Sequence, residues 1–135
     1  MKHLKIDHLG IAVSSIAEAS RSWEALGFRV EARHEVETEK VRVAFLPVGE
    51  ARLELLEPTD ASSPIARFLE TRSGLHHVCV LVDDIEQALE EMTARGVRVL
   101  DERPRPGAGG ARVAFVHPKG SRGVLVELRQ GPKIP

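Results

Sequence analysis

The amino-acid sequence predicts an α+β protein built from two tandem βαβββ modules whose strands form a curved mixed sheet. The first observation behind this prediction is an internal repeat, because residues 6–30 and residues 75–99 align without a gap. The second is the hydrophobic pattern inside each copy, which changes from the alternation of a strand to the three- and four-residue spacing of a helix. Each copy alone is too short to bury a large core, so the two are expected to fold as a fused pair.

The repeat continues beyond these first segments. Residues 42–45 match residues 112–115. Residues 53–55 match residues 126–128 when the second hairpin is allowed to be slightly longer than the first. Since the matches cover nearly the whole sequence, we expect a single domain over residues 1–135.

The repeat also predicts where the modules begin and end. Module one is expected at about residues 4–60, a linker helix at 62–73 and module two at about 74–131. The linker is expected to be helical because Ser62-Ser63-Pro64 offers a cap followed by proline in the first turn.

Each module is expected to open with a strand and continue with a helix. In module one, Leu9, Ile11 and Val13 occupy alternate positions, as a half-buried strand requires. The helix after that strand ends at Gly27, and the matching helix of module two ends at Gly96, because glycine adopts the left-handed backbone that often follows a helix. The sequence thus predicts helices at 15–26 and 84–95 and further strands at 28–36, 41–48, 51–57, 97–102, 111–117 and 123–130.

Strand alternation sorts the polar side chains by face. His8 lies on the face of the first strand opposite to its apolar residues, and Glu54 does the same in the strand at 51–57. The repeat gives His77 the place of His8 and Glu127 the place of Glu54. Two histidines and two glutamates from matching strands are therefore expected on one surface, where an approximate twofold axis would bring them together.

This set of side chains predicts a metal site. Imidazole nitrogens and carboxylate oxygens together suit a borderline divalent cation, and a six-coordinate ion would keep two positions for further ligands. A single inward-facing histidine or glutamate on a strand is usually structural, but both types recurring at repeat-related positions indicate ligation. We therefore expect His8, Glu54, His77 and Glu127 to bind one divalent ion.

Composition excludes several other classes of function. The formal net charge of −1 creates no field that would attract nucleic acid or an anionic membrane. No apolar run is long enough to span a bilayer, and the first residues lack the apolar stretch of a signal peptide. Since the single cysteine, Cys79, has no partner for an internal disulfide, these features together predict a protein of the reducing cytoplasm.

Several motifs are spread over nearly the whole chain. They are Ile6–Ala12, Glu54–Pro58, Ser63–Leu69, Gly74–Val78, Val82–Ile85, Gly109–Phe115, His117–Lys119 and Gly123–Leu128. Together they resemble the vicinal-oxygen-chelate superfamily, which includes glyoxalases, bleomycin resistance proteins and dioxygenases, and in their details the methylmalonyl-CoA epimerase family. The linker helix, the double histidine His76-His77 and the ending of the chain are the more specific of these signals.

The resemblance implies an isomerase activity. It implies inversion of the carbon between the carboxylate and the thioester of methylmalonyl-CoA, by removal of the α-proton and stabilisation of the resulting enolate by a divalent ion. It also implies a homodimer, an acyl-CoA substrate, and cobalt as the first expectation for the ion, with manganese, nickel or zinc as alternatives. Glu127 matches a family carboxylate that combines ligation with proton transfer, so it is the catalytic residue expected.

A second proton-transfer group is not supplied by the resemblance. Some members of the family are thought to use a glutamate on the strand that precedes the Glu54 hairpin. The corresponding stretch here, Val41–Leu46, contains no acidic residue.

Other activities of the superfamily are alternatives. A glyoxalase I-like lactoylglutathione lyase would share the fold, the length and a similar ligand set, but the ending His117–Gly123 differs from the Asp-Pro-Asp-Gly pattern of many glyoxalases. A non-catalytic drug-binding resistance protein would be expected to have lost metal ligands. An extradiol dioxygenase would be expected to have three iron ligands and a longer chain. The ending therefore favours the epimerase over the first alternative, and the complete ligand set favours it over the other two.

Overall fold

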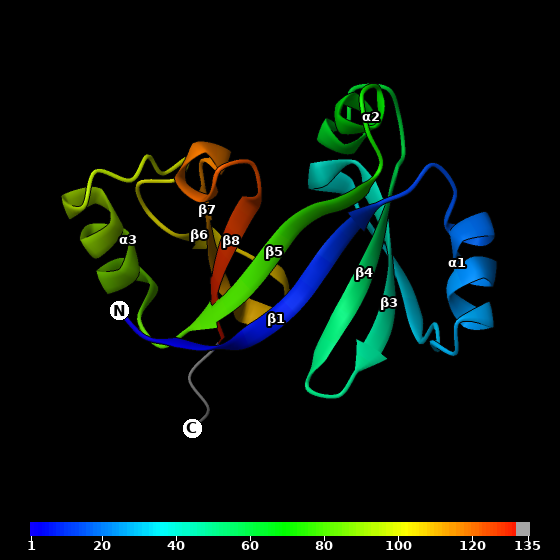
Figure 1. Cartoon of the computed structure of the whole chain (residues 1–135), viewed down its shortest axis with the longest axis horizontal. Helices are drawn as coiled ribbons and strands as arrows, with labels where there is room; N and C mark the ends of the chain where they lie inside the picture. The colour runs from blue at the N-terminus through cyan, green and yellow to red at the C-terminus, as the bar shows by residue number, and fades with distance from the viewer. Residues whose placement is uncertain (132–135) are drawn as a thin grey trace. The chain divides into compact units, whose positions relative to one another are not determined.

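The structure is a computed structural model that describes residues 1–131. The order βαβββ occurs twice, with the short helix α2 between the two copies (Figure 1), which confirms the expected α+β fold of two βαβββ modules. The first module consists of β1 (His3–Ala12), α1 (Ile16–Ala25), β2 (Ala32–Val36), the 3₁₀ turn η1 (Glu37–Glu39), β3 (Val41–Val48) and β4 (Ala51–Pro58). Then follow α2 (Pro64–Leu69), β5 (Gly74–Val82), α3 (Ile85–Ala94), β6 (Arg105–Pro106), η2 (Ala108–Gly110), β7 (Arg112–Val116), η3 (Pro118–Ser121) and β8 (Leu125–Gln130).

The strands of each module form a mixed arrangement. The strand order is β2-β3-β4-β1 in the first module and β5-β8-β7-β6 in the second. In both, the first strand pairs in parallel with the last, while the intervening hairpins are antiparallel. The mixed character expected from the repeat is therefore confirmed.

The compact units of the protein do not coincide with the two halves of the sequence. Unit 2 is the contiguous segment His8–His76, whereas unit 1 combines Met1–Asp7 with the residues from His77 onward. The strands β1 and β5 therefore each contribute residues to both units. In unit 1 the first segment is held by backbone pairing, because the N–H of Asp83 donates to the carbonyl of Lys2 at 3.3 Å.

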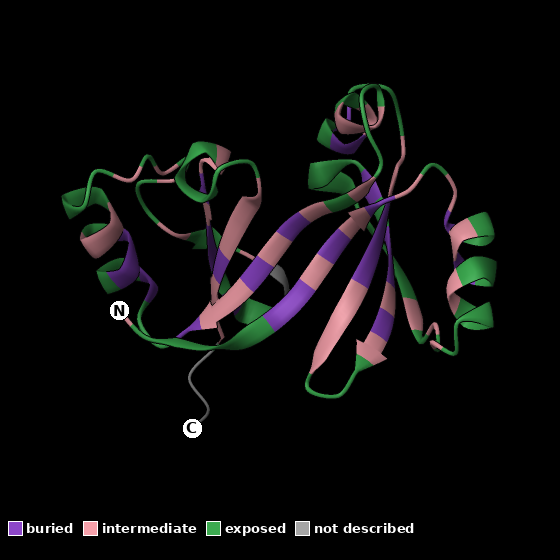
Figure 2. Cartoon of the chain, viewed as in Figure 1, coloured by how far each residue is buried: buried purple, intermediate pink, exposed green. Residues whose placement is uncertain are grey.

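Unit 2 has two core clusters, one between α1 and a face of the sheet and the other on the opposite face beside α2. Ile16 and Trp23 of α1 pack in the cluster that contains Leu46 and Leu55, whose side chains have no exposed surface. Side chains alternate across a strand, so Glu54 lies on the face opposite to this core. Figure 2 shows the same alternation along the second half of β1, where buried and half-buried residues follow one another.

Unit 1 repeats this arrangement with α3. Ile85 and Leu89 of the helix pack with Ala114 of β7 and Leu128 of β8, all of them buried. The alternation again leaves Glu127, the neighbour of Leu128, on the other face of its strand. The two modules therefore direct their matching glutamates away from the core clusters that α1 and α3 cover.

Both long helices begin at a capping side chain, Ser15 for α1 and Asp84 for α3. Ser15 accepts a hydrogen bond through Oγ from the N–H of Glu18 at 3.1 Å, and Asp84 accepts one through Oδ1 from the N–H of Gln87 at 3.0 Å. Such a cap satisfies a backbone donor that the helix itself leaves unpaired. Among residues 1–131, no helix has the length and apolar character that crossing a membrane requires.

A side chain from the last strand of each module also anchors the start of its helix. The N–H of Ile16 donates to Oε1 of Glu57 at 2.9 Å, and the N–H of Ile85 donates to Oε1 of Gln130 at 2.9 Å. Because each bond joins residues more than forty positions apart, the helix and the closing strand of a module support each other.

The prediction of a strand at residues 97–102 is wrong. In the described chain this stretch makes one isolated bridge, and the edge strand β6 comes later. Phe115 of β7 donates its N–H to the carboxylate of Asp101 at 2.8 Å, so a side chain takes the place of a ladder partner. Pro104 and Pro106 follow, and proline has no N–H to give to a ladder. The edge of the second module is therefore irregular.

Candidate active site

In unit 2, β1 and β4 bring a histidine and a glutamate together. The two strands are parallel, and Gly10 lies opposite Glu54 in the ladder. The Nδ1 atom of His8 lies 3.3 Å from Oε2 of Glu54. Both residues are buried, with exposed fractions of 5% and 8%. Burying an imidazole and a carboxylate costs free energy unless each forms hydrogen bonds or binds a metal ion. This buried pair is therefore a candidate for function.

Unit 1 contains the matching pair on β5 and β8. Cys79 lies opposite Glu127, which repeats the register of Gly10 opposite Glu54. The Nε2 atom of His77 lies 3.4 Å from Oε1 of Glu127. His77 is buried and Glu127 is half-buried. The structure therefore brings His8 to Glu54 and His77 to Glu127, while the binding of one ion by all four stays a prediction.

The distances within the two pairs fit neighbouring ligands of a metal ion. With bonds of about 2.1 Å to the ion, two ligand atoms at tetrahedral or octahedral angles lie about 3.0–3.4 Å apart. The observed separations of 3.3 Å and 3.4 Å agree with this range and exceed the roughly 2.9 Å of a good N–H···O hydrogen bond. Nitrogen and carboxylate oxygen are also the donor atoms that divalent transition metals accept. The residues present therefore suit such an ion.

An aromatic ring faces each glutamate from the next strand. Phe45 of β3 is the ladder partner of Glu54, and Phe115 of β7 is the ladder partner of Glu127. The rings of Phe115 and His77 meet edge to face, with centroids 6.3 Å apart. Apolar walls of this kind exclude water and so strengthen the electrostatic interactions beside them.

An arginine outside the expected set of ligands contacts one of the glutamates. Arg52 donates from Nε to Oε2 of Glu54 at 2.8 Å. Its guanidinium also lies over the ring of Phe45, 5.4 Å from the centroid. Arg52 and Glu54 are two residues apart on one strand, so the alternation that selected Glu54 was a signal for Arg52 as well.

The second module places its arginine differently. The position that matches Arg52 in the repeat is Leu125. An arginine from β6, Arg105, lies over the ring of Phe115 at 5.2 Å from the centroid and pairs with Asp101 at 3.6 Å. The two modules therefore share the stacking of arginine on phenylalanine but obtain it from different strands.

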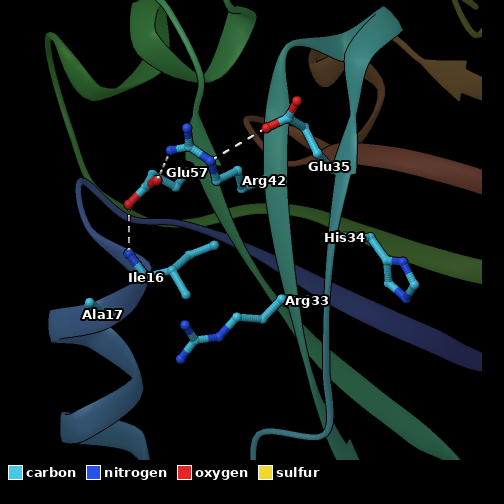
Figure 3. Close-up of a pocket in the computed structure, with 7 residues that line it drawn as sticks. All are labelled: Ile16, Ala17, Arg33, His34, Glu35, Arg42 and Glu57. Carbon is cyan, nitrogen blue, oxygen red and sulfur yellow. Dashed lines mark hydrogen bonds and ion pairs between the residues drawn. The ribbon is translucent and has the colours of Figure 1, made fainter.

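A separate pocket lies on the helix-covered side of unit 2 (Figure 3). It has a volume of about 340 Å³ and is lined by Ile16, Ala17, Arg33, His34, Glu35, Arg42 and Glu57. Arg42 pairs with Glu57 at 2.7 Å and with Glu35 at 3.5 Å, and the bond to Glu57 raises the pKa of the Arg42 guanidinium above its ordinary value. None of the four expected ligands lines this pocket, so it is distinct from the candidate active site.

Comparison with protein families gives the class of this chain. Residues 7–115 match the family model described as the glyoxalase/bleomycin resistance protein/dioxygenase superfamily. The chain therefore belongs to this superfamily, and the resemblance found in its motifs is confirmed.

Within the superfamily, the chain is similar to several individual proteins, among them methylmalonyl-CoA epimerases. The chain is 38% identical to the ethylmalonyl-CoA/methylmalonyl-CoA epimerase of Cereibacter sphaeroides over 130 residues, covering 93% of this chain and 97% of that protein. It is 37% identical to the mitochondrial methylmalonyl-CoA epimerase of Homo sapiens, covering 93% and 73%. It is also 42% identical to the uncharacterized protein YqjC of Bacillus subtilis, covering 92% and 90%.

Solved structures agree with the sequence comparison. A methylmalonyl-CoA epimerase in complex with methylmalonyl-CoA and NH4⁺ matches with a TM-score of 0.88 and 33% identity, covering 98% of both chains. A methylmalonyl-CoA epimerase from Mycobacterium tuberculosis matches with a TM-score of 0.87 and 32% identity, covering 97% of this chain and 90% of that one. These similarities confirm the expectation of an epimerase-like isomerase.

Proposed function

We propose that this protein interconverts the two epimers of methylmalonyl-CoA, and that the activity depends on one divalent ion bound by His8, Glu54, His77 and Glu127. The observation that carries the proposal is the recurrence of a buried histidine beside a glutamate at repeat-related positions, with nearly equal separations of 3.3 Å and 3.4 Å. The names of the relatives, which are methylmalonyl-CoA epimerases, support the substrate.

The donor set indicates what the ion would add. A divalent ion in such a site acts as a Lewis acid that stabilises the negative charge developing on the thioester oxygen of the substrate. Cobalt is the ion expected first, by resemblance to the epimerase family alone. Manganese, nickel and zinc are alternatives, because all four ions accept imidazole and carboxylate ligands.

The residues of the chain have separate parts in the inversion. The Glu127 carboxylate accepts the α-proton, so the C–H bond breaks and its electron pair moves into the enolate. Delivery of a solvent-exchangeable proton to the opposite face then forms the new C–H bond and inverts the carbon. Phe45 and Phe115 face the two glutamates and keep water from that side. His8 and His77 serve as neutral ligands, since a protonated imidazole cannot ligate.

The test of the proposal is deuterium exchange from solvent into methylmalonyl-CoA, followed by mass spectrometry. The protein is prepared with each of the four metals and as a chelated control. We expect incorporation of one deuterium at the α-carbon with the metal-loaded protein and none with the chelated protein. A glyoxalase assay on the same preparation separates the alternative, because turnover of the hemithioacetal of methylglyoxal without exchange into methylmalonyl-CoA would overturn the epimerase proposal.

We also propose that the protein is a homodimer. This part rests on resemblance to the epimerase family alone. Light scattering in solution tests it directly, and a monomer mass would remove the dimer without touching the fold or the activity.

A further inference from the structure

We propose that Arg52 is a positioning residue for Glu54, which it holds in one orientation for the ion. This inference rests on the proposed function, because it concerns how a metal ligand is held. In the second module the position that matches Arg52 is a leucine, Leu125.

The contact between the two residues restricts the carboxylate. Nε of Arg52 lies 2.8 Å from Oε2 of Glu54, a distance typical of a charge-assisted hydrogen bond. The same oxygen lies 3.3 Å from Nδ1 of His8. Rotation of the carboxylate would break the bond to Arg52, and Glu54 is too buried, at 8% exposed, for water to replace that bond easily. The bond to Arg52 therefore restrains the direction of the carboxylate toward His8.

The arginine is itself held in place. Its side chain is only 32% exposed, and its guanidinium lies over the ring of Phe45, which is the ladder partner of Glu54. Phe45 is in turn contacted edge-on by the ring of His34, with centroids 5.3 Å apart. An arginine stacked on an aromatic face has lost part of its rotamer freedom before it binds the carboxylate. The support for Glu54 thus extends across β4, β3 and β2.

The second module has no arginine at the position that matches Arg52. Leu125 stands where the repeat would place Arg52, and a leucine side chain cannot donate a hydrogen bond. The arginine stacked on Phe115 is Arg105, which pairs with Asp101 at 3.6 Å. The position two residues before the glutamate is therefore an arginine in the first module and a leucine in the second. This difference agrees with separate parts for the two glutamates, with Glu54 as a fixed ligand and Glu127 as the group that also moves a proton.

If Arg52 and Glu54 formed only an ordinary surface ion pair, removal of the arginine would have a different effect on metal binding. Such a pair contributes little to stability, about 0–1 kcal/mol, and its removal leaves ligand geometry unchanged. A positioning residue instead changes the affinity and the coordination of the ion, typically by about 10–100-fold in the dissociation constant. Metal binding to the metal-free protein therefore separates the two interpretations without any measurement of activity.

The experiment titrates the metal-free protein with Co²⁺ and records both the binding heat and the visible spectrum. Arg52→Leu introduces the side chain that the repeat has at Leu125, and Arg52→Lys keeps the charge and one donor. The matched control is Arg33→Leu, an exposed arginine of the same unit that lines the pocket on the opposite side of the sheet (Figure 3). Far-ultraviolet circular dichroism establishes that each variant is folded.

We expect Arg52→Leu to weaken Co²⁺ binding by about 10–100-fold and to change the absorption bands of the bound ion. Arg52→Lys is expected to recover part of the affinity, and Arg33→Leu to bind as the unchanged protein does. Affinity and spectrum unaltered in Arg52→Leu would overturn the inference, and if that variant does not fold, the same outcome in Arg52→Met, which also lacks the charge and the donor, would overturn it. Absence of binding of all four proposed ions, Co²⁺, Mn²⁺, Ni²⁺ and Zn²⁺, by the unchanged protein would instead refute the metal dependence in the proposed function, so the two failures are distinguishable.

Discussion

Glutamine in place of Glu127 or of Glu54 separates proton transfer from ligation. In Glu127→Gln the side chain keeps its size and one oxygen able to ligate, but the amide is not a base. A well-placed base accelerates proton transfer by a factor of about 10²–10⁴. This factor corresponds to about 2.7–5.4 kcal/mol of activation free energy. We therefore expect exchange of the α-proton to fall by that factor while the ion stays bound.

The consequence in Glu54→Gln follows from the contact with Arg52. The bond of 2.8 Å to Arg52 would remain, but its acceptor would be a neutral amide oxygen instead of a carboxylate. Loss of charge assistance costs about 1 kcal/mol. If this cost falls on the bound state, the affinity for the ion drops about fivefold and the rate at saturating metal changes little.

The assay is deuterium incorporation into methylmalonyl-CoA at matched metal occupancy. Metal content is measured by elemental analysis in each preparation, because loss of the ion would imitate loss of the base. A larger rate loss in Glu127→Gln than in Glu54→Gln supports the assignment. Equal losses at equal occupancy would refute the reasoning and show that Glu127 is not the base.

Three further predictions concern stability. Removal of a helix cap by Ser15→Ala or Asp84→Ala should each lower the free energy of unfolding by about 1 kcal/mol, measured by urea denaturation, and no change would show that the caps are dispensable. Gly107→Ala should lower the melting temperature and cost about 1–3 kcal/mol of unfolding free energy, because the added Cβ would lie 2.8 Å from Cγ1 of Val113. The control is Gly131→Ala, whose Cβ would meet no atom within 4 Å. Chelation should also lower the melting temperature, since an ion present at 100 times its dissociation constant adds about 2.7 kcal/mol, and an unchanged melting curve would contradict tight binding to the folded protein.

The sequence predicts the two long helices of this protein well because their signals are local, whereas the linker helix expected at 62–73 is shorter, Pro64–Leu69. Serines at 14 and 15 and Gly27 bound the first helix in the sequence, and aspartates at 83 and 84 and Gly96 bound the second. The structure selects Ser15 and Asp84 as the caps. Each signal depends on a few adjacent residues, so it can be recognised without knowledge of the rest of the chain. The faces of β4 and β8 are predicted equally well, because alternation also follows from neighbouring positions.

Features that depend on contacts between strands are harder to predict from the sequence. Apolar alternation in residues 97–102 indicates a strand, yet the carboxylate of Asp101 binds the N–H of Phe115 in place of the ladder. In the same way, alternation puts Arg52 on the face of Glu54 but gives no sign that the guanidinium bends back to that carboxylate. The contact is also hard to predict from the repeat, because a repeat predicts that the two modules are alike.

The split composition of unit 1 bears on the order in which the protein folds. Unit 2 is one uninterrupted segment, whereas unit 1 needs Met1–Asp7 to meet the residues that begin at His77. Joining those two pieces closes a loop, and the entropic cost falls when the intervening chain is already folded. We therefore expect unit 2 to form first in refolding, with amides of β4 protected from hydrogen exchange before those of β8. The pair His8–Glu54 would then exist before its counterpart His77–Glu127, and simultaneous protection of β4 and β8 would contradict this order.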